Sequence, residues 1–486
     1  TFLEALKNLH SPINLEDTTA QKRLAYDELL ASQLAKAMLY SRITAKTGAK
    51  ISAAKSSLNL PYELTSDQKK SLAEIEADMN SGNRMFRLLQ GDVGSGKTIV
   101  AMLAALSTVA SGFQAVLMMP TTLLAIQQYQ NISKLLEPLG IKVAILTSNE
   151  KGKLREEILV KTKNGEINIL IGTHALVQDW VEFKNLGLAV IDEQHRFGVL
   201  QRLKLTEKNE QAHILLMTAT PIPRTLSLAY YGEMQISYIR QKPAMQKPIE
   251  TFVMPTEKIF EIKQRIKNAI NSGEKIYWIC PLIEESEKSD LAAAKDRFSE
   301  FKAEFGNLVG LVHGRMKERE KDEVLQKFFA GEYKILVATT VIEVGINVPD
   351  ATIMFIEHAE RFGLSQLHQL RGRVGRGEKE SKCILLYAGN LSENSAARLK
   401  IIKNSTDGFV IAEEDLKLRG SGEVLGTKQS GFAEFKFASF PQDVELLESA
   451  RNETINIVRS SQITQNHKLL LSLFEYDESI DYVNAG

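Results

Sequence analysis

The stretch at residues 86–98 reads Phe-Arg-Leu-Leu-Gln-Gly-Asp-Val-Gly-Ser-Gly-Lys-Thr and is followed by the apolar run 99–110. A short apolar run that ends in Gly-x-x-x-x-Gly-Lys-Thr and continues into a helical pattern is typical of a phosphate-binding loop. The glycines allow the backbone to wrap around a phosphate, and the N-terminus of the following helix favours an anion. We therefore predict that a strand, this loop and a helix form a nucleotide site.

Six residues of the loop are expected to hold the phosphates of ATP: Gly91, Gly94, Ser95, Gly96, Lys97 and Thr98. Lys97 can reach the β- and γ-phosphates, and the hydroxyl of Thr98 can bind Mg²⁺. A chance glycine-rich turn is the alternative, but it would not explain the apolar run before the loop and the helical pattern after it. ATP and Mg²⁺ are therefore the expected cofactors.

An acidic element follows the apolar run 188–191 and reads Asp192-Glu193-Gln194-His195. A phosphate loop needs a carboxylate at the end of a neighbouring strand. We therefore expect Asp192 to hold the Mg²⁺ and Glu193 to orient or deprotonate the attacking water. A pair of solvated acids at a strand end is the alternative. No cluster of Cys and His accompanies His195 in the sequence, so zinc is not expected there.

Short apolar runs alternate with longer helical patterns before and after residues 240–248, a segment that contains two prolines. This alternation predicts an α/β fold made of two tandem parallel-sheet domains joined by a hinge. The expected parts are an N-terminal helical segment and linker (1–62), a first α/β domain that binds ATP (63–240), a second α/β domain (241–390) and a C-terminal region with a helical hairpin, a loop and terminal helices (391–486).

The charges of the chain balance, since Lys and Arg number 60 and Asp and Glu number 60. Nucleic-acid binding must therefore rest on local patches. The basic residues of segment 36–55 could follow a DNA backbone or form a solvated linker. No apolar run approaches the ~20 residues that cross a bilayer. Cys280 and Cys383 lie in apolar runs, which favours free buried thiols and the cytoplasm.

The sequence Asp192–His195 resembles the DExH box of superfamily 2 helicases, and further motifs follow in the order of that superfamily. The resemblance implies two RecA-like motor domains. It implies that Gln68 contacts adenine, that Gly345 of motif V lies near the nucleotide, and that His195 belongs to the network that couples nucleotide to DNA. The other residues implied in DNA contact or coupling are Thr121 (motif Ia), Thr173 and His174 (motif Ib), and Thr218 and Thr220 (motif III).

Residues 366–376 read Gln-Leu-His-Gln-Leu-Arg-Gly-Arg-Val-Gly-Arg and resemble motif VI. Arg373 and Arg376 would then reach the γ-phosphate from the second domain, stabilise the charge of the transition state and close the cleft. Surface arginines on a helix are the alternative, but this would leave the matching glutamines and glycines unexplained. Arg373, Arg376, Lys97 and Glu193 are the expected catalytic residues.

Residues 192–198 and 220–226 narrow the resemblance to the duplex-DNA motors that include the RecG family and the transcription–repair coupling factors. Residues 415–431 resemble the translocation element that these families share, with Arg419 and Gln429 as candidates for its lever. The continuation through residue 437 is more similar to the RecG family. The start of the chain resembles the segment that follows the wedge domain of that family, so we expect this wedge to be absent here.

The resemblance implies an ATP-dependent DNA helicase that remodels stalled replication forks and Holliday junctions. Expected partners are double-stranded and branched DNA and a single-strand DNA-binding protein. We expect a monomer, not bound to a membrane, in the bacterial cytoplasm and associated with the nucleoid. Three alternatives stay open: a translocase of the coupling-factor type, a DExH RNA helicase and an ATP-gated DNA clamp. Asn347 replaces the usual acid of motif V, which predicts a weaker, neutral contact to ribose.

Overall fold

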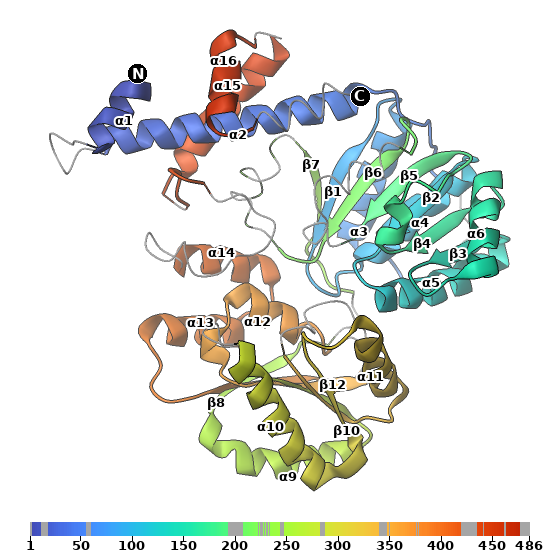
Figure 1. The fold of residues 1–486 in the computed structure, drawn as a ribbon, viewed down its shortest axis with the longest axis vertical. Coiled ribbons are helices and arrows are strands. Elements are labelled where there is room, and N and C mark those ends of the chain that lie inside the picture. Colours follow the sequence, from blue (N-terminus) through green and yellow to red (C-terminus); the bar gives the residue numbers. More distant parts are fainter. Residues whose placement is uncertain are drawn as a thin grey trace.

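The computed structural model shows two lobes, each built on its own sheet (Figure 1). The described residues are 2–10, 18–54, 60–192, 208–221, 223, 227, 229, 232, 234–243, 247–281, 287–339, 348, 350–375, 377, 379–418, 435–440, 442–460 and 463–476. Among the helices of these ranges, none combines the length and the apolarity that a membrane crossing requires.

The first lobe carries a seven-stranded sheet in the order β3-β4-β2-β5-β6-β1-β7. All its strands are parallel. The strands are β1 (Phe86–Gly91), β2 (Gln114–Met118), β3 (Val143–Leu146), β4 (Ile169–Gly172), β5 (Leu186–Ile191), β6 (His213–Thr218) and β7 (Gln235–Ile239). Its helices are α3 (Ser66–Asn80), α4 (Lys97–Ala110), α5 (Thr122–Leu136) and α6 (Gly152–Asn164).

Both faces of this sheet are buried. In β1, Leu89 belongs to the core cluster that contains residues of α3, α4 and α5, whereas its neighbour Leu88 belongs to the cluster on the opposite face. Leu117 and Val116 of β2 divide between the two clusters in the same way. A parallel sheet covered on both faces needs continuous apolar runs, and this is why the strands were visible in the sequence.

The second lobe is also built on a parallel sheet, which has six strands in the order β10-β11-β9-β12-β13-β8. Its strands are β8 (Glu250–Pro255), β9 (Lys275–Ile279), β10 (Val309–Val312), β11 (Ile335–Ala338), β12 (Ala351–Ile356) and β13 (Lys382–Tyr387). Its helices are α9 (Ile259–Asn271), α10 (Glu287–Phe305), α11 (Glu318–Ala330) and α12 (Leu364–Arg371). The expected α/β fold with two tandem parallel-sheet domains is confirmed.

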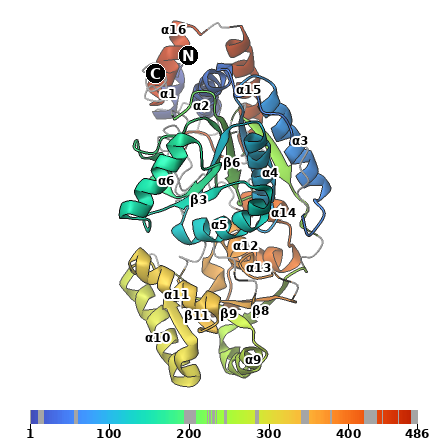
Figure 2. The ribbon, with the colours of Figure 1, turned by 90° about the vertical axis from the view of Figure 1, so that its right-hand side faces the viewer.

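Two further helices, α13 (Glu393–Asn404) and α14 (Gly408–Leu418), follow β13. Together with α12 they lie on the side of the second lobe that faces the first, and Figure 2 shows them between the two sheets. The ends of these helices are therefore in a position to touch the first lobe.

Helices from the two ends of the chain form a bundle beside the first lobe. They are α1 (Phe2–His10), α2 (Thr19–Ala45), α15 (Val444–Arg459) and α16 (Gln465–Leu473). Leu29 and Leu34 of α2 share one core cluster with Leu447 of α15 and Leu471 of α16. Packing of apolar side chains thus joins segments that are far apart in the sequence (Figure 1).

The basic segment 36–55 packs in part against other elements, although the side chains of Arg42, Lys46 and Lys50 are exposed. Lys36 donates hydrogen bonds to Ser32 Oγ at 2.7 Å and to the Ala229 carbonyl at 2.5 Å. Ala49 and Ile51 are 2% and 0% exposed. Both pair with the first lobe through their backbones, so this part of the segment belongs to the packed body.

The two cysteines are free and buried, as the sequence predicts. Burial raises the pKa of the Cys383 thiol to about 12 and raises that of Cys280 as well. Both thiols therefore stay protonated and unreactive at neutral pH.

Candidate nucleotide site at the seam between the lobes

The loop between β1 and α4 has the form that a phosphate requires. Gly94 and Gly96 have φ values of 78° and 82°, in the left-handed region that favours glycine. A side chain at Gly96 would also clash with Gln68. Gly96 is the N-cap of α4. The N–H groups in the first turn of α4 therefore lie next to the loop without partners inside the helix. The sequence placed this loop correctly between a strand and a helix.

Lys97 and Ser95 supply polar groups inside the loop. The Lys97 ammonium donates to the carbonyls of Gly91 and Asp92 at 2.9 and 3.0 Å. Ser95 is fully buried, and its hydroxyl has no hydrogen-bond partner within the described ranges. A buried hydroxyl without a partner is costly, and a phosphate oxygen would satisfy it. These groups therefore fit the triphosphate of ATP.

Gln68 braces the loop from α3. Its side-chain oxygen accepts from the Thr65 backbone N–H at 2.9 Å, and its amide nitrogen donates to the Ser95 carbonyl at 2.8 Å. The Thr65 hydroxyl in turn accepts from the Gln68 N–H, which completes a capping box. Both ends of the amide are thus occupied, and contact of Gln68 with adenine stays a prediction.

The acidic element lies at the same edge of the sheet as the loop. Ile191 pairs with Leu216, and Thr218 pairs with Gln90, so β5, β6 and β1 end side by side. Asp192 follows directly after β5, at this edge of the sheet, and the binding of Mg²⁺ by Asp192 and Thr98 stays a prediction. Glu193 and His195 lie outside the described residues.

Motif III connects this edge to the phosphate loop. The hydroxyls of Thr218 and Thr220 lie 2.8 Å apart, and the Thr220 N–H donates to the Thr218 hydroxyl at 3.3 Å. The amide of Gln90, one residue before the loop, donates to the Thr220 carbonyl at 3.4 Å. Motif III is thus hydrogen-bonded to the strand that leads into the loop, and its role in coupling stays a prediction.

The residues of motifs Ia and Ib lie at neighbouring strand ends. Thr121 caps α5 by accepting from the Leu124 N–H at 3.3 Å. Thr173 is 3% exposed, and within the described ranges its hydroxyl has no partner. His174 is exposed at the start of the short helix His174–Val177. Contact of these three residues with DNA stays a prediction.

The second lobe reaches the loop through α12 and the turn that follows it. A Cβ at Gly372 would lie 2.9 Å from the Cβ of Val93, so the two backbones approach closely across the seam. Arg373 follows Gly372 and is 6% exposed. The remaining predicted site residues lie outside the described residues: Arg376, Gly345, Arg419 and Gln429, together with Asn347.

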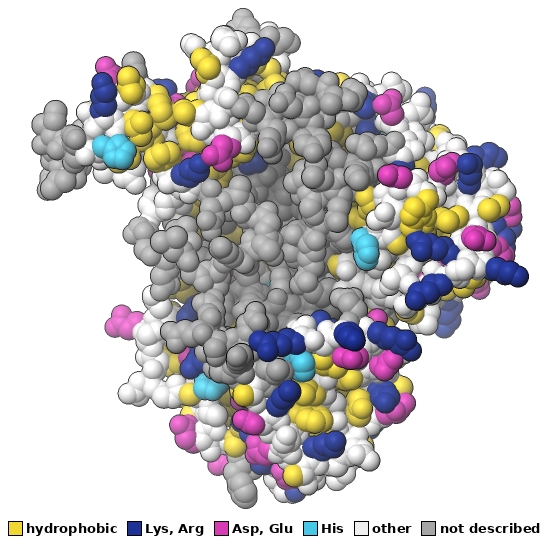
Figure 3. Space-filling view, viewed as in Figure 1, with side chains coloured by type: hydrophobic (Ala, Val, Ile, Leu, Met, Phe, Trp, Pro, Cys, Tyr) yellow, Lys and Arg dark blue, Asp and Glu magenta, His cyan; other side chains and the backbone are white. Residues whose placement is uncertain are grey.

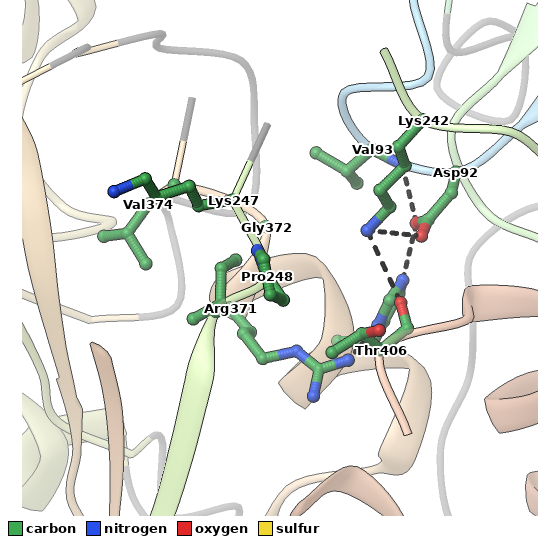
Figure 4. Close-up of a pocket in the computed structure, with 12 residues that line it drawn as sticks. Asp92, Val93, Lys242, Lys247, Pro248, Arg371, Gly372, Val374 and Thr406 are labelled. Atoms are coloured by element: carbon green, nitrogen blue, oxygen red, sulfur yellow. Dashed lines mark hydrogen bonds and ion pairs between the residues drawn. The ribbon is translucent and has the colours of Figure 1, made fainter. Parts of the chain in front are cut away.

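A cavity of about 140 Å³ lies at this seam (Figure 4). It is lined by Asp92 and Val93 of the loop, by Lys242, Lys247, Pro248 and Ile249 of the segment between the lobes, by His368, Arg371, Gly372, Val374 and Gly375, and by Thr406. Both lobes and the connecting segment therefore contribute to one hollow.

Asp92 is a residue of this seam that the sequence did not single out. Its carboxylate is 2.5 Å from His368 Nε2 and 3.1 Å from the Lys242 ammonium. Burial alone would raise the pKa of Asp92, but the hydrogen bond from His368 and the Lys242 ammonium hold this pKa well below its usual range. Only one feature of the sequence could have pointed to Asp92. It is a charged residue at a position where the phosphate-loop pattern accepts any residue.

Two parallel-sheet lobes that meet over a phosphate loop define the helicase class of ATP-driven motors. Family models agree: one for DEAD/DEAH box helicases matches residues 65–228, and the helicase conserved C-terminal domain matches 257–378. A third, described as ATP-dependent DNA helicase RecG, domain 3, C-terminal, matches 405–472. The chain belongs to the RecG family of ATP-dependent DNA helicases, and it is an ATP-hydrolysing DNA helicase.

Curated relatives support this membership along most of the chain. The RecG helicase of Bacillus subtilis is 47% identical over 468 residues, which cover 94% of this chain and 68% of the relative. The RecG helicase of Streptococcus pneumoniae is 45% identical, with 98% of this chain and 72% of the relative covered. The sequence resemblance to this family is therefore confirmed.

Solved structures extend the comparison. A structure of RecG bound to a three-way DNA junction aligns with a TM-score of 0.74 at 42% identity and covers 88% of this chain and 57% of that chain. Saccharomyces cerevisiae Dbp5 bound to RNA and ADP BeF3 aligns with a TM-score of 0.50 at 16% identity, covering 80% of this chain and 98% of that one. The second likeness shows the fold alone.

Proposed function

We propose that this helicase moves along double-stranded DNA and remodels branched DNA such as stalled forks and Holliday junctions. The observation that carries the proposal is the similarity, at 42% identity, to RecG bound to a three-way junction. The match of residues 405–472 to the C-terminal part of RecG domain 3 adds support, because these residues follow the two helicase lobes.

Local charge favours contact with DNA although the net charge is zero. Figure 3 shows Lys and Arg side chains gathered along the side of the second lobe that faces the first. Phosphate contacts by such residues supply most sequence-independent affinity for DNA. We propose a monomer that works in the bacterial cytoplasm on the nucleoid, with a single-strand DNA-binding protein as a partner.

In the proposed cycle the phosphate loop and motif VI hold the nucleotide from opposite sides. Lys97 turns from the carbonyls of Gly91 and Asp92 toward the terminal phosphates. Arg373 and Arg376 approach the same phosphates from the second lobe and stabilise the charge that develops during hydrolysis. Thr98 and Asp192 would hold a Mg²⁺ ion, which neutralises phosphate charge when it is bound.

Loss of the γ-phosphate removes the shared partner of the two lobes, so the seam opens. Thr121, Thr173 and His174 contact the DNA backbone from the first lobe in this proposal, and Thr218 and Thr220 transmit the state of the nucleotide to them. Glu193 acts on the attacking water, and His195, Gly345, Arg419 and Gln429 keep the roles that the family resemblance implies.

The test compares ATP hydrolysis and strand displacement on forked, four-way and linear duplex DNA. We expect duplex DNA to stimulate hydrolysis and branched substrates to be converted to displaced products. Stimulation by double-stranded RNA alone would overturn the proposal in favour of an RNA helicase. Binding without any hydrolysis would indicate an ATP-gated clamp.

A further inference from the structure

We propose that Asp92, although it lies inside the phosphate loop, is a positioning residue that serves the second lobe. It holds the turn between α13 and α14 against the nucleotide site and so transmits nucleotide binding to these helices. Its side chain is 2% exposed and negatively charged. A buried carboxylate would repel a phosphate, so its role must be sought in its other contacts.

The first contact of the Asp92 carboxylate is with His368, and the donor and the acceptor in it can be assigned. Arg371 Nη2 lies 2.9 Å from His368 Nδ1, and a guanidinium can only donate hydrogen bonds. His368 Nδ1 is therefore the acceptor, and the ring proton is on Nε2, which donates to Asp92 Oδ1 at 2.5 Å. The histidine thus links the guanidinium to the carboxylate in one fixed tautomer.

The far side of Arg371 holds the end of α13. Its Nη1 donates to the carbonyls of Ile402 and Ser405 at 2.5 and 2.8 Å. A second route runs through Lys242, whose ammonium is 3.1 Å from Asp92 Oδ2 and 3.4 Å from the Thr406 carbonyl. The turn that begins at Ser405 is therefore connected to Asp92 twice.

The start of α14 touches the carboxylate directly. A Cβ at Gly408 would lie 2.9 Å from Asp92 Oδ1, 2.6 Å from His368 Nε2 and 2.6 Å from Pro221 Cγ. Only glycine leaves room for this approach. The phosphate loop, motif III and motif VI thus meet at the first residue of α14.

The next residue fixes α14 to the first lobe. The Arg240 guanidinium lies 5.0 Å from the centre of the Phe409 ring, and the ring of Tyr238 lies 6.1 Å from that of Phe409. A cation over an aromatic face is attracted to it, so these contacts hold the helix start in place while the seam is closed.

Asp92 therefore has two connections. Its main-chain carbonyl accepts from Lys97, which must leave it to reach a phosphate, while its side chain holds the turn before α14. A nucleotide that draws Lys97 away alters the position of Asp92. The contacts to His368 and Lys242 then pass this change to α13 and α14.

The direct test is hydrogen exchange of the full chain with and without Mg²⁺ and AMP-PNP. We expect the nucleotide to change the exchange of amides in residues 405–418. In Asp92→Asn, which keeps the shape and one acceptor but loses the charge, this response should fall about tenfold, as is typical when coupling between sites is lost. A response of Asp92→Asn equal to that of the unaltered chain would overturn the proposal.

A kinetic test separates positioning from nucleotide binding. The substrate is a linear duplex that carries a third strand as a triplex, which a moving helicase displaces. The number of third strands displaced per ATP hydrolysed should fall about tenfold in Asp92→Asn, while the KM for ATP changes less than about twofold. A tenfold rise in KM with unchanged displacement per ATP would make Asp92 a nucleotide ligand and overturn the proposal. Because the kinetic test rests on the proposed movement along duplex DNA, an unaltered chain that displaces no third strand counts against that movement, and the exchange result then decides the role of Asp92.

Two more variants keep the test independent of folding defects. Lys242→Gln should act in the same direction as Asp92→Asn, and the double variant should be no worse than Asp92→Asn alone, because both act through one contact. Additive losses would overturn this shared route. Lys267→Gln is the matched control, since Lys267 pairs with Glu304 at 2.9 Å outside the seam.

Discussion

The seam around Asp92 and the junction around Lys36 each hold a charged side chain between distant parts of the chain, fully buried at Asp92 and half-buried at Lys36, and they do so in opposite ways. Asp92 has partners from the second lobe and from the connecting segment, which keep its carboxylate ionised. Lys36 donates to neutral oxygens of Ser32 and Ala229, and burial lowers its pKa to about 7. The seam therefore keeps its charge and has charged or polar partners from two parts of the chain, whereas the ammonium of Lys36 can lose its charge at the junction.

The same junction contains an anchor on α2. The Glu28 carboxylate accepts from the backbone N–H groups of Lys436, Phe437 and Ala438 at 2.6, 2.8 and 3.0 Å. Glu28 is 4% exposed, and Lys36 lies 5.9 Å from the ring of Phe435. The segment after residue 434 is thus fixed to α2, while α14 before it is fixed to the seam. A change at the seam should therefore alter activity, and a change at the junction should alter stability.

The largest effect is expected from Lys97→Ala at the seam. Hydrolysis should fall by about 10²–10³-fold, the loss typical for removal of one donor to a developing charge. Binding to duplex DNA should persist. ATP turnover with duplex DNA and retention of DNA in a gel would measure the two properties. Turnover close to that of the unaltered chain would show that this loop does not bind the nucleotide that is hydrolysed.

At the junction, Glu28→Gln should destabilise the bundle and leave the catalytic constants for ATP almost unchanged. A glutamine offers one acceptor oxygen where the carboxylate offered two, so at least one of the three backbone N–H groups loses its partner, at a cost of about 1–3 kcal/mol. Denaturant unfolding would measure this cost. Glu448→Gln, an exposed position on α15, is the control and should shift stability by less than about 0.5 kcal/mol. Equal effects of the two variants would argue against an anchor at Glu28.

The third effect concerns the pH dependence of stability and Lys36. The pKa of this ammonium is about 7 in the folded chain and 10.5 in the ordinary state, so between these values the folded chain holds fewer protons than the unfolded chain. Stability should therefore rise with pH across this window. In Lys36→Met the rise should be smaller, because the titrating group is gone. Thermal unfolding at several pH values would measure this. If stability rises equally with pH in both chains, the Lys36 ammonium is solvated and its pKa is not lowered by burial.

The sequence predicted those parts of the molecule that local patterns encode. The strands are continuous apolar runs because both faces of each sheet are buried, and the phosphate loop follows β1 as expected. The contact of Asp92 with His368 joins residues 276 positions apart, and no local period reveals such a pair. Gln68 was assigned to adenine by resemblance, which stays a prediction, and no local pattern revealed that its amide also donates to the Ser95 carbonyl. The basic segment was open to two interpretations because burial of Lys36 depends on Ala229 and Phe435, which lie far away in the sequence.

The pairing of α2 with α15 has a consequence for synthesis on the ribosome. Residues 19–45 emerge early, but the helix that covers their apolar face begins only at Val444. Both lobes can close over their own sheets before that point, since domains fold as units while the chain grows. The part of α2 that packs against α15 therefore stays without this cover, exposed or held by a chaperone, until residues 444–459 have been translated.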